Sequence, residues 1–373
     1  MSKGKIPWWT VKLTGDESSC IKKVLDSGFI NEGPVTLNLE QTFKDYFNVE
    51  HAIFTTSGTV AIFLALKALG VSVGTKVAVP NLTFVATASA VKLCGGIPIL
   101  IDVDPETLTI DSEDLQLKHN LHKFDFVVPV HISGRSAFSP KVLEVINNCD
   151  MKVVEDAAEA FGSRDPGSKN FLGTIGIAGA FSFSPNKVLT SGQGGLVVTN
   201  DHNVANTIRS LKDQGRTKRG TGGDDLHPYF GFNFKFTDIQ AALLEAQLPS
   251  LDRKLNHLKS VYLHFKDRIN LDQNHKLLKF DISSGEIPLW PEFTTPSRDS
   301  LEEILNQNNV GYRNVWHPLN EQQPYAERGD TLRNSKLASL NTLWLPSSFD
   351  LLEGDLVKVS DLINEFIRSK RTS

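Results

Sequence analysis

A lysine and a carboxylate hold positions in this sequence that suit covalent chemistry on a bound small molecule. Lys187 follows the apolar segment 178–183, and the glycine-rich run 192–195 comes soon after it. A lone lysine is more often a solvated surface charge, but a buried-looking strand and a glycine turn enclose this one. Such surroundings keep an amine away from bulk water, as a lysine that forms a Schiff base requires.

Asp156 is the second candidate, because it follows the predicted strand 151–155, which contains the apolar pair 153–154. In the run VEDAAEAFG (154–162), Asp156 and Glu159 lie beside alanines, which leaves room for a flat ring. Taken alone, a carboxylate at this position could equally be a metal ligand or a helix cap.

A third set of residues could hold an anion. Ser57, Gly58 and Thr59 stand directly before a helical stretch. Free backbone N–H groups at the start of a helix bind anions, although Ser and Thr are also ordinary N-caps.

Together with Asp156 and Lys187, these residues form the set that pyridoxal phosphate (PLP) requires. Its phosphate needs amides and hydroxyls, its pyridine nitrogen needs a carboxylate, and its aldehyde needs a lysine.

The surrounding pattern predicts the elements that would position these residues. Short apolar runs alternate with amphipathic stretches between residues 50 and 200, which indicates a mainly parallel sheet with helices on both faces. Ligands bind at the carboxyl ends of such strands, so the residues just after each strand form the candidate site. We expect strands at 76–80, 97–103, 124–130, 151–155, 178–183 and 196–199, and helices at 58–69, 83–93 and 140–148.

The chain is expected to be an α/β protein with two domains. Its 373 residues suit a large PLP-binding domain, 1–250 with the N-terminal segment, and a small C-terminal α/β domain, 251–373. A helical pattern runs from 237 to 271 with few breakers. The glycine-rich segment 215–229 is either a surface loop or a mobile flap over the site.

Composition argues against several classes of function. A net charge of −4 gives no basic surface for nucleic acid or acidic membranes. The three cysteines lack CxxC spacing, which argues against a disulfide framework or a zinc site, so we expect no metal. The sequence shows neither a signal-peptide pattern nor an apolar run of membrane length, which favours a cytoplasmic enzyme.

The chain resembles the DegT/DnrJ/EryC1/StrS family of sugar aminotransferases, within the fold-type-I PLP enzymes. The similarity extends over nearly the whole chain. The matching motifs stand in the family's order: TSGTVA (56–61), PNLTFVAT (80–87), IDVDPETL (101–108), PVHISG (129–134), VEDAAEAFG (154–162), FSFSPNK (181–187), GQGGLVVT (192–199) and GFNFKFTDIQAAL (231–243).

The resemblance implies a role for each candidate residue. Lys187 would bond to the cofactor's aldehyde, and Asp156 would pair with its pyridine nitrogen. Glu159 takes the place of a Gln or His near the ring oxygen, and Phe84 takes that of an aromatic stacked on the ring. The phosphate would be held by Gly58, Thr59, Ser182 and, from a neighbouring subunit, Asn233. A homodimer with shared active sites is therefore implied.

The segment 312–319 is similar to one that lines the sugar pocket in perosamine-synthase-like members of the family. Arg313 and His317 are accordingly expected to contact the substrate. The implied reaction transfers an amino group from glutamate to a nucleotide-linked keto-sugar, first of all a 4-keto-6-deoxy sugar. Such a product serves surface polysaccharide biosynthesis, for example of lipopolysaccharide O-antigen.

Three alternatives stay open at the level of sequence. The ketone could lie at C3 of the sugar, or in a cyclitol. The chain could also be a non-catalytic regulatory protein that kept the fold. Related dehydratases lack the Schiff-base lysine, so Lys187 argues against that reaction.

Overall fold

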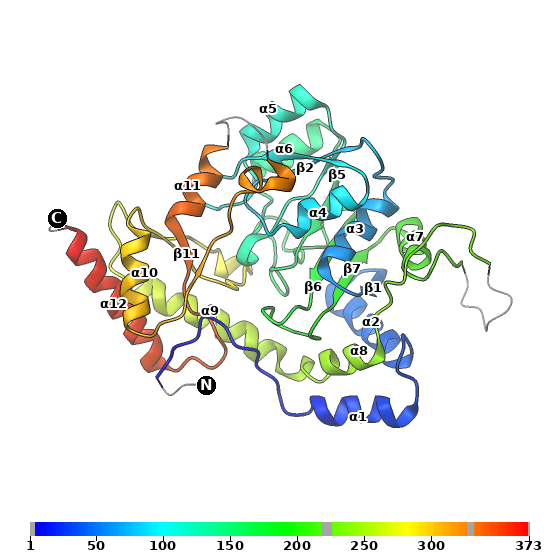
Figure 1. Ribbon diagram of the computed structural model, residues 1–373, viewed down its shortest axis with the longest axis horizontal. Coiled ribbons are helices and arrows are strands. Elements are labelled where there is room, and N and C mark those ends of the chain that lie inside the picture. The colour runs from blue at the N-terminus through cyan, green and yellow to red at the C-terminus, as the bar shows by residue number, and fades with distance from the viewer. Residues whose placement is uncertain (1–3, 218–225, 327–331, 372–373) are drawn as a thin grey trace.

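A seven-stranded sheet lies at the centre of the larger part of the chain (Figure 1). The computed structural model describes residues 4–217, 226–326 and 332–371. β7 is antiparallel to both of its neighbours, and the other neighbouring strands are parallel, which confirms the predicted fold class. In spatial order the strands are β1 (His51–Thr55), β7 (Gly195–Thr199), β6 (Ala178–Ser182), β5 (Lys152–Asp156), β4 (Phe126–Val127), β2 (Lys76–Pro80) and β3 (Ile97–Ile101).

Helices cover both faces of this sheet, because its strands are apolar on both faces. Along β6, Ala178 and Ala180 join the core formed with α3, α4 and α7. Phe181 points to the other face, where its ring stacks on Phe47 of α2 with 4.7 Å between centroids. The helices that precede the second sheet are α1 (Glu17–Ser27), α2 (Pro34–Phe47), α3 (Gly58–Ala68), α4 (Ala86–Leu93), α5 (Ser112–His122), α6 (Pro140–Asn148), α7 (His202–Lys212), α8 (Asp238–Glu245) and α9 (Leu251–Arg268).

A second, antiparallel sheet belongs to the C-terminal part of the chain. Its order is β10 (Arg313–Asn314), β11 (Thr342–Trp344), β9 (Glu292–Thr294) and β8 (Lys276–Leu277). It shares a separate core with α9, α10 (Arg298–Gln307) and α12 (Glu353–Arg371), while α11 (Arg333–Asn341) precedes β11. In Figure 1, α10 and α12 lie at the left end of the molecule. The domain boundary near residue 250 stays a prediction.

The helical pattern from 237 to 271 forms two helices rather than one. Proline has no N–H, and its ring clashes with the carbonyl four residues earlier, so Pro249 interrupts the helical pattern. The chain forms α8, a 3₁₀ turn (Leu248–Ser250) and then α9. The predicted flap at 215–229 falls largely on residues 218–225, which lie outside the described residues.

Other predicted elements are shorter than expected, and the strand predicted at 97–103 ends at Ile101. The helix predicted at 83–93 begins only at Ala86, and the strand predicted at 124–130 is limited to Phe126–Val127. Within the described ranges, no helix combines the length and the apolarity needed to cross a membrane.

Candidate active site

The carboxyl ends of β5 and β6 border a cavity of about 260 Å³, here called the inner cavity. The parallel pairing of these strands places Asp156 opposite Ala180, and the turn that carries Lys187 follows β6 at the same edge. The wall brings together predicted site residues from distant parts of the sequence: Gly58, Thr59, Phe84, Asp156, Glu159, Ser182, Lys187 and Arg313.

Asp156 is a buried carboxylate with few partners. Only 5% of the residue is exposed. Its Oδ2 accepts a hydrogen bond from the hydroxyl of Thr87 at 2.7 Å, and its Oδ1 accepts one from the N–H of Ala158 at 3.2 Å. Burial raises the pKa of Asp156, and these hydrogen bonds and the charge of Lys187 offset part of the rise. A cation in the cavity, such as the protonated ring nitrogen of PLP, would therefore be stabilised here.

Glu159 links the lysine to the wall of the inner cavity. Its Oε1 accepts a hydrogen bond from Nζ of Lys187 at 3.3 Å, and its Oε2 accepts one from the N–H of Ser133 at 3.0 Å. Burial raises the pKa of Glu159, and the charge of Lys187 is the largest opposing effect. A carboxyl group that keeps its proton more readily than usual could donate a hydrogen bond to the ring oxygen of PLP.

Three side chains from outside the cavity fix the turn that carries Lys187. They donate hydrogen bonds to backbone carbonyl groups of this turn: Trp9 to Pro185 at 3.1 Å, Lys254 to Val188 at 3.1 Å, and Gln247 to Thr190 at 2.6 Å. Burial lowers the pKa of Lys254 to about 8. The position of the reactive amine thus depends on the N-terminal segment and on the junction of α8 and α9.

The start of α3 supplies an anion site that also lines the cavity. Ser57 is the N-cap, because its Oγ accepts a hydrogen bond from the N–H of Val60 at 3.3 Å. The N–H groups of the first turn have no acceptor within the helix. A Cβ on Gly58 would lie 2.9 Å from that of Ser182, so glycine allows α3 and β6 to approach closely. This arrangement fits the phosphate of PLP.

Two tryptophans and a threonine belong to the site although the sequence did not point to them. Trp290 is 1% exposed, and Nζ of Lys187 lies 4.8 Å from the centre of its ring. The ring of Trp316 lies 6.5 Å from that of Phe84. Trp316 and Thr87 stand inside recognised motifs, which could have identified them. No local signal marks Trp290, because it arrives from the chain before β9.

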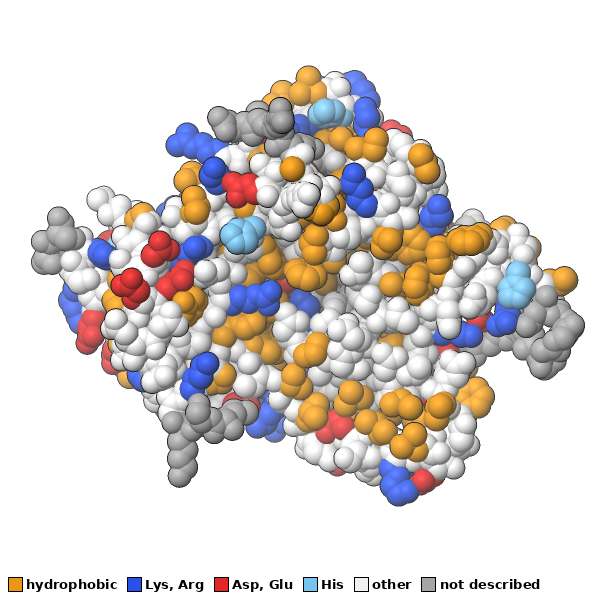
Figure 2. All heavy atoms as spheres, in the orientation of Figure 1, with side chains coloured by type: hydrophobic (Ala, Val, Ile, Leu, Met, Phe, Trp, Pro, Cys, Tyr) orange, Lys and Arg blue, Asp and Glu red, His pale blue; other side chains and the backbone are white. Residues whose placement is uncertain are grey.

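A second cavity of about 680 Å³, here called the outer cavity, adjoins the inner one. The two share Thr83, Phe84, Arg313 and Trp316. His317 is exposed and lines only the outer cavity, so the structure does not bring it to Lys187. Figure 2 shows hydrophobic side chains gathered across the middle of the face it presents, with Lys and Arg side chains among them.

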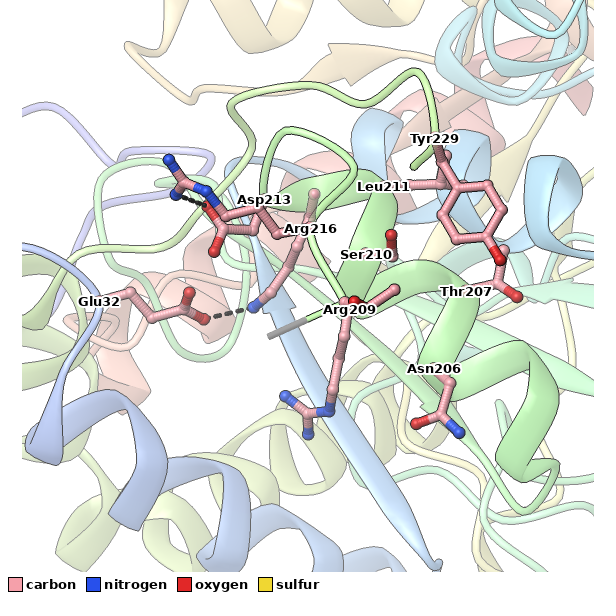
Figure 3. A pocket seen from close by; sticks show the side chains of 11 residues that line it. Glu32, Asn206, Thr207, Arg209, Ser210, Leu211, Asp213, Arg216 and Tyr229 are labelled. Atoms are coloured by element: carbon pink, nitrogen blue, oxygen red, sulfur yellow. Dashed lines mark hydrogen bonds and ion pairs between the residues drawn. The ribbon is translucent and has the colours of Figure 1, made fainter. Parts of the chain in front are cut away.

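A further cavity of about 680 Å³ beside α7 contains none of the predicted site residues (Figure 3). Its lysine, Lys212, is buried and donates hydrogen bonds to Glu32 and to the carbonyl of Phe54. Arg216 pairs with Asp213 at 3.3 Å, as the dashed line in Figure 3 marks. Because the amine of Lys212 is engaged in this way, the inner cavity is the better candidate for a reactive lysine.

Asn233 does not line the inner cavity of its own chain. The residue is exposed, and its backbone forms a bridge with Asp213. Its role toward the cofactor of a neighbouring subunit stays a prediction.

Comparisons with known proteins show what this chain is similar to. The model of the DegT/DnrJ/EryC1/StrS aminotransferase family matches residues 12–364. The chain is 32% identical to a GDP-perosamine synthase of Caulobacter vibrioides, over 95% of this chain and 96% of that protein. It is also 32% identical to a GDP-perosamine synthase of Escherichia coli O157:H7, over 98% and 99% of the two chains. The crystal structure of S. venezuelae DesV in complex with a ketimine intermediate has a TM-score of 0.90 at 26% identity, covering 98% of this chain and 99% of that one.

Asp156→Asn should stabilise the protein when no cofactor is bound. The amide keeps the shape: its oxygen can accept from the N–H of Ala158, and its NH2 can donate to the hydroxyl of Thr87, which can donate to the carbonyl of Phe84 instead. Because the substitution removes a buried charge, the free energy of unfolding should rise by about 1 kcal/mol near neutral pH. The pKa of Asp156 is raised in the folded state. At pH values above this folded-state pKa, the charge of Asp156 therefore lowers the free energy of unfolding of the wild type. This loss of stability disappears as the pH falls toward 3.8, the ordinary pKa of an aspartate. The stabilisation by Asp156→Asn should therefore shrink in acid. Urea unfolding across this pH range measures the effect.

The exposed carboxylate of Asp26 provides a control for this experiment. Asp26→Asn should change the free energy of unfolding by less than about 0.5 kcal/mol at any pH. A loss of stability in Asp156→Asn at neutral pH would contradict the assignment of Asp156 as a carboxylate whose charge is unfavourable in the folded protein.

Proposed function

Because this chain belongs to the DegT/DnrJ/EryC1/StrS aminotransferase family, we propose that it transfers an amino group from glutamate to a nucleotide-linked 4-keto-6-deoxy sugar. The enzyme class itself, a PLP-dependent sugar aminotransferase, follows from the family. The observation that carries the proposal is the inner cavity, in which Lys187 and Asp156 share one wall at the ends of neighbouring strands.

Each part of the inner cavity suits one part of PLP. The start of α3 and Ser182 would hold the phosphate, Asp156 would face the ring nitrogen, and Glu159 would face the ring oxygen. The exposed ring of Phe84 offers a surface for stacking. When bound, PLP supplies an electron sink for the carbon that exchanges its proton. The task of Asp156 is to keep the ring nitrogen protonated, which its buried carboxylate favours.

Lys187 would move the proton in both halves of the reaction. Its amine takes the proton from the carbon that bears the amino group of the donor, and it later delivers a proton to the sugar carbon that receives the amino group. Glu159 holds this amine at 3.3 Å when it is free. The donor leaves as a 2-oxo acid before the sugar binds, so we expect ping-pong kinetics.

The outer cavity suits the nucleotide-linked part of the acceptor. Phe84 and Trp316 offer apolar surface, and Arg313 and His317 offer hydrogen-bond donors. Two relatives are named GDP-perosamine synthase, which favours GDP as the first nucleotide to test. We further propose that the product serves surface polysaccharide biosynthesis, such as that of lipopolysaccharide O-antigen, in the cytoplasm.

A homodimer with two shared sites completes the proposal. Asn233 is exposed and stands apart from its own inner cavity, which supports a role toward the neighbouring subunit's cofactor. Phe29, Ile30 and Phe230 are exposed by 51%, 51% and 83%, and such apolar side chains fit an interface that association would bury.

A screen of keto-sugars tests the proposed reaction directly. The PLP-loaded enzyme is incubated with glutamate and with GDP-, UDP- or dTDP-linked keto-sugars, and mass spectrometry detects the amino sugar. We expect product from a 4-keto-6-deoxy sugar. Amination of 3-keto-sugars or cyclitols alone would refute the position of the ketone. An absence of any change in cofactor absorbance with glutamate would favour a non-catalytic protein.

Lys187→Ala should abolish multiple turnover and remove the near-visible absorbance band of the lysine-bound cofactor. The substitution deletes the nucleophile and the proton carrier together, so the turnover rate should fall by at least about a thousandfold. Lys254→Met, which removes only an outer support of the same turn, should lower the rate far less. Near-normal turnover in Lys187→Ala would rule out the assignment of Lys187.

Mixing two inactive parents tests the shared sites. Lys187→Ala and Asn233→Ala should each have low activity, and subunit exchange should restore part of it, because one site of each hybrid dimer is intact. Analytical ultracentrifugation on the same samples reports the assembly. A fully active monomer would contradict the dimer. Mixing each parent with itself under the same conditions is the control.

A further inference from the structure

A cavity of about 240 Å³, here called the basic cavity, is separate from the cavities described above. It shares no lining residue with them. Its walls come from the N-terminal segment, from the first two turns of α9 and from the chain after β11. Four of its five lining residues have basic side chains, and none of the five is acidic. They are Lys12, Arg253, Lys254, His257 and Phe349.

Lys254 is a buried cation without a carboxylate partner. The residue is 4% exposed. Its Nζ donates hydrogen bonds to the carbonyl of Val188 at 3.1 Å and to Oε1 of Gln247 at 3.3 Å, and both acceptors are neutral. Among the described residues, no ion pair includes Lys254. Burial lowers its pKa to about 8. A buried charge is costly without an opposite charge, so an anion beside Lys254 would be stabilised.

The acidic groups near this cavity have other partners. The charge of Glu17 acts on Lys254, but its carboxylate accepts a hydrogen bond from the N–H of Thr14 at 2.6 Å. Burial opposes the effect of such hydrogen bonds, yet together they lower the pKa of Glu17. Asp350 pairs with Lys12, and this hydrogen bond lowers the pKa of Asp350. Lys12 is therefore balanced by an acid, whereas the other basic residues of the cavity are not.

Arg253 and His257 complete the basic wall. They stand four residues apart on α9, so they lie on the same side of the helix. In the part of the chain that the structure describes, no ion pair or hydrogen bond includes Arg253. Nε2 of His257 lies 2.9 Å from the carbonyl of Ser348, which can only accept, so Nε2 carries a proton. Protonation of Nδ1 would give His257 a second donor, which an anion in the cavity would favour.

We propose that the basic cavity binds a phosphate group, as inorganic phosphate or as a small phosphate monoester, through Arg253, Lys254 and His257. The oxygens of a phosphate accept hydrogen bonds from several directions, which basic side chains around one cavity can supply. The cavity is slightly smaller than the inner cavity of about 260 Å³, so it suits a small phosphate rather than a nucleotide. This inference does not depend on the proposed function.

Two residues of the basic cavity also contact the support of the turn that carries Lys187. Lys254 donates a hydrogen bond to a carbonyl of this turn. The ring of Phe349 lies 5.0 Å from that of Trp9, which donates to another carbonyl of the same turn. A bound phosphate would keep Lys254 protonated, and a charged donor forms a stronger hydrogen bond than a neutral amine. Occupancy of the basic cavity is thus coupled to the turn of the reactive amine.

Calorimetry with inorganic phosphate on the PLP-loaded enzyme tests the site, because bound PLP fills the anion site at the start of α3. The wild type should bind phosphate with a Kd of about 1 mM or tighter. Arg253→Gln and Lys254→Met should each weaken binding by about tenfold, and His257→Gln by roughly threefold. The control is Lys266→Gln, which removes a charge from an exposed position of α9 outside the cavity and should change binding by less than about twofold.

The pH dependence of sulfate binding tests the part of Lys254. The charge of sulfate does not change between pH 7 and 9, whereas Lys254 loses its proton near pH 8. Sulfate should therefore bind about threefold or more weakly at pH 9 than at pH 7 in the wild type, and Lys254→Met should lose this difference. Glu17 and Asp350 stay ionised because their pKa values are lowered, and His257→Gln repeats the measurement without the imidazole. The remaining charged groups of the wall are Lys12 and Arg253.

A phosphate monoester distinguishes the two sources of the phosphate group. Glycerol 3-phosphate should compete with inorganic phosphate and lose affinity in Arg253→Gln to the same extent. Tighter binding of glycerol 3-phosphate than of phosphate would support an ester as the ligand, and weaker binding would support free phosphate. Saturating GDP should leave phosphate binding unchanged, because the basic cavity shares no residue with the outer cavity.

Four outcomes would overturn the inference. The first is an absence of binding to the wild type at about 10 mM phosphate. The second is unchanged binding in both Arg253→Gln and Lys254→Met. The third is an equal loss in Lys266→Gln, which would reflect only the net charge of α9. The fourth is displacement of phosphate by GDP, which would assign the phosphate to the outer cavity. If Lys254→Met does not fold, Arg253→Gln decides by the same comparison.

Discussion

The parallel pairing of β5 with β6 is the constraint on which the site depends. Asp156 is the last residue of β5 and lies opposite Ala180, so the carboxylate and the lysine turn emerge at one edge of the sheet. A shift of register by one residue would turn Asp156 to the other face. The register is fixed by the buried residues on both faces, such as Val154 and Phe181. The apolar core is therefore as necessary to the chemistry as the charged groups are.

The inner cavity combines buried carboxyl groups with an anion site before any cofactor binds. Asp156 and Glu159 lie on one wall, and burial raises the pKa of both carboxyl groups. The start of α3, with its free N–H groups, also lines this cavity. PLP carries a negative phosphate at one end and a ring nitrogen that can bear a positive charge at the other. The folded chain thus keeps an unfavourable charge distribution that a molecule of this polarity would relieve, which couples cofactor binding to stability.

Local patterns predicted the parts of the site that lie directly after strands. Asp156, Lys187 and the start of α3 follow from apolar runs, small residues and a helix N-cap, all of which are visible in short windows of sequence. The break between α8 and α9 also has a local cause. Pro249 lacks the N–H that a continuous helix needs, so the helical pattern on either side of it does not form one helix. Trp290 could not be predicted in this way, because its contact with Lys187 depends on how the second sheet packs against the first.

The N-terminal segment joins the turn that carries Lys187 to Arg313. Trp9 donates a hydrogen bond to the turn that carries Lys187, while the ring of Trp8 lies 5.3 Å from that of Trp290. The guanidinium of Arg313 rests over the same Trp8 ring. Interiors are close-packed, so a shift of this segment cannot be absorbed by empty space. The amine of Lys187 and the guanidinium of Arg313 therefore share one aromatic support, and displacing that support would disturb both together.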